Sequence, residues 1–179
     1  SGEDGVKDYA NRMAGIEKIK NWKPGDKPFV LFLPLLYPHC PYTAPEAYYD
    51  KYLNQEIELR PHGEGKPEFH HLIREYRSLN DEDALKKVQA VYLSMITYSD
   101  MLLGRLMDAL ETSPAGEDTL LIATSDHGDY AGDYGLVEKW PNGFEDVLTR
   151  VPLIVRGPNV AKGHRVKNQV ELRDLLPTF

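Results

Sequence analysis

Three apolar runs along the chain have the length and composition of buried strands. They span residues 28–34, 119–125 and 151–156. Because the apolar residues in these runs do not alternate regularly with polar ones, both faces of each strand should be covered, as in a parallel sheet. A fourth segment, residues 166–172, has the pattern of an edge strand. The pattern therefore predicts an α/β fold with a mostly parallel sheet.

Helical spacing of apolar residues marks two long segments between these runs. Residues 5–22 repeat apolar side chains every three or four positions and run into the helix-breaking pair Pro24-Gly25. Residues 82–112 begin after a polar cap at Asp81, with acids in the first turn that complement the helix dipole. We expect the apolar stripe of the second helix to lie on one face of the sheet.

The segment from residue 44 to residue 80 has a mixed pattern. It predicts a short helix near its start and a loop at residues 60–67, which is rich in glycine and proline. His62, His70 and His71 could suggest a metal site. However, two of them are adjacent and no third ligand is suitably spaced, which favours surface histidines.

Composition narrows the class of protein. The chain has 179 residues, of which 41% are hydrophobic, enough to form the core of one domain. Its net charge of −7 argues against nucleic-acid binding, which requires clustered basic residues. The single Cys40 excludes an internal disulfide framework. No run approaches the roughly 18 consecutive apolar residues of a membrane span, so we expect no membrane-spanning segment.

A cluster of chemically useful residues follows the apolar run at 119–125. It is Asp126-His127-Gly128-Asp129. In open α/β sheets ligands bind beyond the carboxyl ends of strands, so Asp126 and His127 would lie where such folds bind ligands. A carboxylate and a neutral imidazole suit a cation, and a glycine allows a sharp turn between them. An ordinary capped turn would have the same composition, and the residues alone leave both interpretations open.

A second candidate is His39, which follows the apolar run at 28–34. It lies between Pro38 and Pro41, which restrict the backbone on both sides. A histidine held in this way could direct its imidazole toward an anion. Taken alone, the pattern also fits a loop histidine without a ligand.

The order of residues from Thr124 to Lys139 adds a family resemblance. The segment TSDHGDYAGDYGLVEK resembles the T-S-D-H-G-D/E-x-x-G-D/E-x-x-L-x-x-K segment of the sulfatase family, a branch of the alkaline phosphatase superfamily. Residues 38–42 resemble the family pattern P-H-x-P-Y/F/W, and residues 174–178 resemble its D-L-x-P-T. Glu145 and Arg150 lie in a further family pattern, and we interpret them as structural. The resemblance implies an alkaline-phosphatase-like fold and a sulfuric ester hydrolase.

The resemblance also implies roles for four residues. Asp126 and His127 match positions that ligate or border a divalent cation, usually calcium. Lys139 matches a lysine that contacts the sulfate oxygens. His39 matches a histidine beside the leaving-group oxygen and the sulfate, so His39 and Lys139 would be catalytic and substrate-binding residues. The implied substrate is a small-molecule or glycan sulfate ester, and the family favours a periplasmic or secreted protein.

Two parts of a sulfatase site have no match in the chain. The family nucleophile is a formylglycine made from Cys or Ser in a C-x-P-S-R-type motif, and residues 40–44 have proline in the wrong place and no arginine. The family's N-terminal strand with paired Asp ligands is also absent. We therefore expect residues 1–179 to be one α/β domain, the central part of a longer sulfatase, and to be inactive alone. A fragment of a phosphonate or phosphodiester hydrolase of the same superfamily, or a non-catalytic anion-binding domain, remains an alternative.

Overall fold

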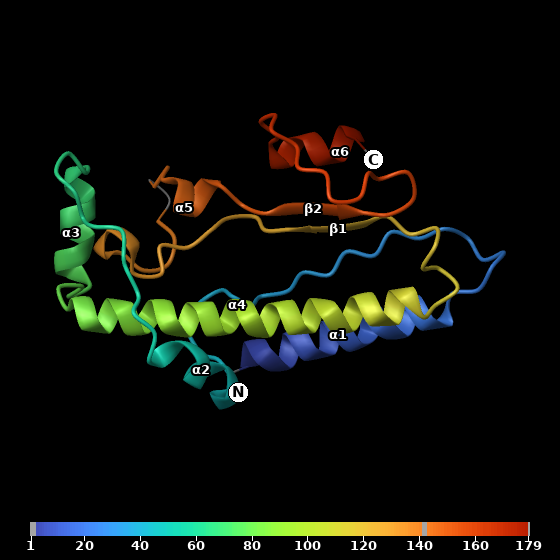
Figure 1. The fold of residues 1–179 in the computed structure, drawn as a ribbon, viewed down its shortest axis with the longest axis horizontal. Coiled ribbons are helices and arrows are strands. Elements are labelled where there is room, and N and C mark those ends of the chain that lie inside the picture. The colour runs from blue at the N-terminus through green and yellow to red at the C-terminus, as the bar shows by residue number, and fades with distance from the viewer. Residues whose placement is uncertain (1–2, 141–142, 179) are drawn as a thin grey trace.

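A computed structural model describes residues 3–140 and 143–178 of the chain (Figure 1). In order, the elements are α1 (Glu3–Asn21), α2 (Glu46–Leu53), α3 (Glu68–Tyr76), α4 (Glu82–Glu111), β1 (Leu121–Thr124), the 3-10 turn η1 (Asp133–Gly135), α5 (Asp146–Thr149), β2 (Leu153–Arg156), the 3-10 turn η2 (Leu172–Asp174) and α6 (Leu175–Thr178). Within these ranges, no helix is both long and apolar enough to cross a membrane.

Helix α4 is the longest element, and the other elements are arranged around it. Its first turn is capped by the Asp81 carboxylate, which accepts a hydrogen bond from the Ala84 amide at 3.1 Å. Helices α1 and α2 lie along one side of α4, and the sheet runs along the other side (Figure 1). At one end of α4, Leu110 packs with Ile19 of α1 and Ala115, and β1 contributes Leu121 to this cluster. The helices predicted at 5–22 and 82–112 are confirmed within one or two residues at each end.

The sheet differs from the prediction in strand direction. Strands β1 and β2 pair antiparallel, with Leu121 opposite Arg156 and Thr124 opposite Leu153. The apolar runs at 119–125 and 151–156 do form strands, but the mostly parallel sheet is wrong for the described residues. The chain between Thr124 and Leu153 turns back without a crossover helix, and such a connection produces an antiparallel pair.

Residues 28–34 and 166–172 form no strand in the described part of the chain, which corrects both predictions. Residues 28–34 are attached to α1, where the side-chain Nδ2 of Asn11 donates to the Pro34 carbonyl at 3.2 Å. Val30 and Phe32 are 98% and 83% exposed. A strand requires a neighbour that satisfies its backbone hydrogen bonds, and apolar composition cannot show whether that neighbour is present.

Candidate functional site

The backbone after β1 is held in a tight turn around His127. The Ser125 hydroxyl donates to the His127 carbonyl at 2.8 Å, and the Asp126 carboxylate accepts from the His127 amide at 3.0 Å. The Gly128 amide donates to the Leu148 carbonyl at 2.8 Å. A Cβ at Gly128 would overlap the carbonyl oxygen of Val147. The glycine is therefore required for the close approach of this turn to α5.

The His127 ring joins the turn to Lys139. Its Nδ1 lies 2.7 Å from the carbonyl oxygen of Gly128, which can only accept, so Nδ1 carries the hydrogen. Nε2 then has a free lone pair, and the Lys139 ammonium donates to it at 2.6 Å. The Asp126 carboxylate lies 3.7 Å from the same nitrogen and is 86% exposed. The Lys139 ammonium and the Asp126 carboxylate thus both lie near the Nε2 lone pair of His127.

The loop that carries His39 is fixed from α1. The buried Asp8 carboxylate accepts from the Leu36 amide at 2.8 Å and from the Tyr37 amide at 2.9 Å. The His39 amide donates to the Leu36 carbonyl at 2.7 Å, which closes the turn. These bonds hold the His39 ring with its centroid 6.0 Å from that of His127. The structure therefore brings His39, His127 and Lys139 together, with Asp126 at the exposed edge of the cluster.

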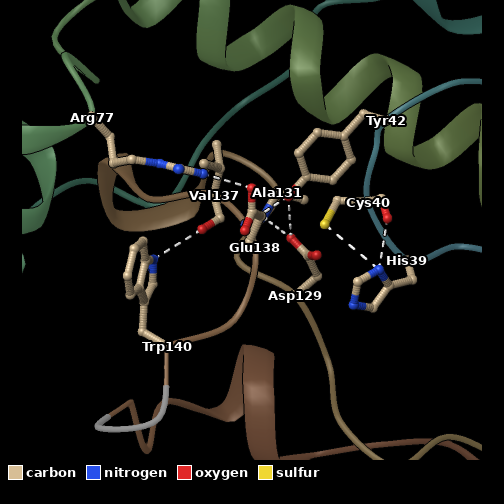
Figure 2. A network of polar contacts seen from close by, with 9 residues as sticks. All are labelled: His39, Cys40, Tyr42, Arg77, Asp129, Ala131, Val137, Glu138 and Trp140. Atoms are coloured by element: carbon tan, nitrogen blue, oxygen red, sulfur yellow. Dashed lines mark hydrogen bonds and ion pairs between the residues drawn. The ribbon is translucent and has the colours of Figure 1, made fainter.

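A partly buried network links the His39 loop to the segment that carries Lys139, as Figure 2 shows. The Tyr42 hydroxyl donates to Asp129 Oδ1 at 2.8 Å and accepts from the Glu138 amide at 2.6 Å. Burial raises the pKa of the Asp129 carboxyl, and burial together with the Asp129 charge raises the pKa of Tyr42. Sequence reasoning did not assign Tyr42 or Asp129 to the site. The available signal was their position inside the two family motifs.

Glu138 and Trp140, on either side of Lys139, are also held (Figure 2). The Glu138 carboxylate pairs with the Arg77 guanidinium at 2.6 Å, and the Trp140 indole donates to the Val137 carbonyl at 3.1 Å. Glu138 itself adopts a left-handed conformation with φ of 63°. The peptide that positions Lys139 is therefore strained, and its neighbours hold it in this conformation.

A second polar cluster surrounds Glu145. Its carboxylate accepts from the Tyr130 hydroxyl at 2.6 Å and from the Lys66 ammonium at 3.2 Å. Burial alone would raise the pKa of Glu145, but hydrogen bonds from Tyr130, from its own backbone amide and from Lys66 lower it below its ordinary value. Nε2 of His70 lies 3.5 Å from the same carboxylate. These contacts agree with the structural role predicted for Glu145, whereas Arg150 is exposed and, among the described residues, forms an ion pair with Asp146 at 3.9 Å.

The interpretation of all three histidines in this region as surface residues is wrong for His70. His70 is 0% exposed, whereas His71 is exposed and His62 is partly buried. Adjacent residues on a helix point about 100° apart, so one can face the core while the next faces solvent. Burial lowers the pKa of His70 and favours its neutral form.

The cation predicted by the resemblance can be tested against the donor set. A metal-binding histidine commonly donates its second nitrogen to a carbonyl, and His127 Nδ1 does so to Gly128. The Asp126 carboxylate supplies the hard oxygen that calcium prefers. Asp126 and His127 therefore fit a cation, but the described residues contain no group of three or more suitable side chains. The remaining ligands would have to come from elsewhere.

Comparison with known proteins identifies the family. The sulfatase family model matches residues 7–179. The chain belongs to the sulfatase family. It is 34% identical over 178 residues to the uncharacterized sulfatase YidJ of Escherichia coli, covering 96% of this chain and 35% of that protein. It is 30% identical over 185 residues to a choline-sulfatase of Rhizobium meliloti, covering 99% of this chain and 36% of that protein.

A solved structure supports the fold. The phosphonate monoester hydrolase SpPMH of Silicibacter pomeroyi superposes with a TM-score of 0.67 at 26% identity, over 82% of this chain and 32% of that one. The fold is therefore that of sulfatases and phosphonate hydrolases of the alkaline phosphatase superfamily, of which this chain holds a part. The chain spans about a third of the length of the curated relatives that it matches.

Proposed function

We propose that this chain is the central part of a longer sulfatase and forms one side of its active site. Family membership and the sulfatase relatives support hydrolysis of a sulfate ester by the longer protein. The observation that carries the proposal is the 2.6 Å contact of Lys139 Nζ with His127 Nε2, together with the nearby His39 ring. The proposed substrate is a small-molecule or glycan sulfate ester.

Lys139 and His39 would have different roles in the hydrolysis of such an ester. The Lys139 ammonium would bind the sulfate oxygens and stabilise negative charge that shifts during transfer. His39 Nδ1 donates to the Cys40 carbonyl at 2.7 Å, which leaves Nε2 as the nitrogen that exchanges a proton with the leaving-group oxygen. The nucleophile, formylglycine in this family, would come from another part of the longer protein.

Asp126 and His127 would hold a cation, for which calcium is the proposal. Calcium would supply positive charge next to the sulfate oxygens when bound. Because calcium takes six to eight ligands, mostly oxygens, these two residues alone should bind it weakly. Lys139 now donates to His127 Nε2, so a cation bound at that nitrogen would require the ammonium to move aside.

A phosphonate monoester is the second candidate substrate. The likeness to SpPMH, at 26% identity and a TM-score of 0.67, favours it. Both kinds of ester present anionic oxygens that an ammonium and a cation can bind, so Lys139 and a cation held by Asp126 and His127 would serve either one.

The test is to express the chain with the coding sequence on both sides, in a host that makes formylglycine. An aryl sulfate and an aryl phosphonate monoester should be assayed with calcium, with and without Asp126→Ala. We expect turnover of the sulfate that Asp126→Ala abolishes. Turnover of only the phosphonate would assign a phosphonate monoester as the substrate in place of a sulfate ester. Binding of sulfate without turnover of either ester would support a non-catalytic anion-binding domain.

A further inference from the structure

The Tyr42 hydroxyl is hydrogen-bonded on both sides within the described site. A phenol has one hydrogen to donate, and Tyr42 donates it to Asp129 Oδ1 at 2.8 Å. Its oxygen accepts the Glu138 amide hydrogen at 2.6 Å. The ring is also held, because it packs edge-on against Tyr92 of α4 with centroids 6.3 Å apart. The hydroxyl therefore has a fixed position relative to α4.

Tyr42 connects three segments of the chain that the site depends on. It lies three residues after His39, in the loop that Asp8 fixes. Its acceptor Asp129 lies two residues after His127, and Asp129 in turn accepts from the Ala131 amide at 2.8 Å. Its donor is the peptide nitrogen of Glu138, the residue directly before Lys139. One hydroxyl thus joins the segments that carry the imidazoles and the ammonium (Figure 2).

Glu138 requires such an anchor. Its backbone has φ of 63°, a conformation that residues other than glycine adopt only at a cost in energy. The Glu138 carbonyl accepts from the Tyr130 amide at 3.1 Å, and its carboxylate pairs with Arg77 at 2.6 Å. With the Tyr42 hydroxyl on the amide, Glu138 is held at three points, and the direction in which Lys139 leaves the backbone is set.

We propose that Tyr42 is a positioning residue that, through the Glu138 amide, sets where the Lys139 ammonium lies in the site. Replacing Tyr42 by Phe keeps the ring against Tyr92 but removes the acceptor for the amide and the donor to Asp129. The Asp129 carboxylate and the Glu138 N–H then lose a partner in a partly buried place, so the strained peptide relaxes and the ammonium moves. Displacements of about 1 Å at such a group can cost ~100-fold in rate.

This inference rests on the proposed function for its rate measurements, so its test includes two readouts that need no turnover. The protein expressed with its flanking coding sequence should be prepared as wild type, Tyr42→Phe, Lys139→Met and the double variant. Tyr92→Phe is the matched control, because it removes a hydroxyl from the neighbouring ring. The readouts are hydrogen exchange at the Glu138 amide, affinity for inorganic sulfate, and kcat and KM on the sulfate ester.

We expect Tyr42→Phe to speed exchange at the Glu138 amide, weaken sulfate binding about 10-fold and lower kcat/KM by about 10- to 100-fold. In the Lys139→Met background, Tyr42→Phe should have no further effect on sulfate binding or on kcat/KM, because it acts through the lysine. Tyr92→Phe should leave all three readouts near wild type.

Full additivity with Lys139→Met would overturn the inference, and so would faster exchange with unchanged sulfate affinity. If no ester is turned over but Tyr42→Phe and Lys139→Met weaken sulfate binding non-additively, the proposed reaction fails while the positioning role stands.

Discussion

Lys139 Nζ donates to His127 Nε2 at 2.6 Å, so the proposed sulfate-binding group and a proposed cation ligand are in direct contact. The contact places the positive charge of Lys139 beside His127 Nε2. It also means that the two residues cannot be varied independently of each other, because removal of either one frees the other.

Lys139→Met should therefore lower kcat/KM on the sulfate ester by about 100- to 1,000-fold, as the loss of a group that stabilises transition-state charge does. Steady-state kinetics of the protein expressed with its flanking sequence would measure this. Lys162→Met, at an exposed lysine after β2, is the control. A loss confined to KM, with kcat unchanged, would show that Lys139 binds substrate without assisting the reaction.

Calcium affinity should depend on Asp126. Asp126→Asn removes the carboxylate charge that lies 3.7 Å from His127 Nε2. We therefore expect the calcium dissociation constant, measured by calorimetry, to increase at least 10-fold. Asp146→Asn is a suitable control, because its exposed carboxylate pairs only weakly with Arg150 at 3.9 Å. Equal affinities in wild type and Asp126→Asn would remove Asp126 from the set of ligands.

The sequence predicted helices and motifs better than strand pairing. Residues 82–112 could be recognised because helical hydrogen bonds are local and the apolar period reports them. Residues 28–34 have the composition of a buried strand, yet Val30 and Phe32 are exposed and no described strand lies beside them. Strand pairing depends on residues that are far away in the sequence, and the composition of one segment does not specify them.

In the site, too, local sequence patterns were predictive and contacts between distant residues were not. His39, Asp126, His127 and Lys139 were predicted from motifs with fixed spacing, and the structure places them near one another. The buried position of His70 was missed, because a residue's neighbours in space decide its burial. Tyr42 was missed as a link for the same reason, since its partners Asp129 and Glu138 are 87 and 96 positions away in the chain.

His70 should make the fold sensitive to mild acid. Burial lowers its pKa in the folded state, so the unfolded chain takes up a proton at about pH 6.5 while the folded chain resists it. The contribution of neutral His70 to the stability of the fold is complete above that pH and is lost as the pH falls below it. Thermal unfolding between pH 7.5 and 5 should show a falling Tm in wild type and a flatter curve in His70→Phe.

His71→Phe is the control for this experiment, because His71 is exposed in the same helix. An equally flat curve in His71→Phe, or an unchanged slope in His70→Phe, would assign the acid sensitivity to another group. Glu145 contributes in the same direction but at lower pH, because its lowered pKa gives stability that is lost only when the carboxylate is protonated.

Gly128→Ala should destabilise the turn after β1. The added Cβ would overlap the Val147 carbonyl oxygen, so either α5 or the His127 turn must shift. We expect a loss of about 1–3 kcal/mol in unfolding free energy, the range for overpacked sites, measured by urea denaturation. Gly63→Ala provides the comparison, because no atom lies within 4 Å of its added Cβ, and it should change stability by less than about 0.5 kcal/mol.

The 179-residue chain alone should have no sulfatase activity. It contains the residues proposed to position the ester, but the described residues supply no family nucleophile and at most two of the proposed cation ligands. A covalent nucleophile carries the bond-breaking step, and groups that orient a substrate have little effect without it. The purified chain and the protein expressed with its flanking sequence should be assayed side by side on an aryl sulfate with calcium. Activity should appear only in the longer protein, and turnover by the 179-residue chain that Asp126→Ala abolishes would show that the chain contains a complete site.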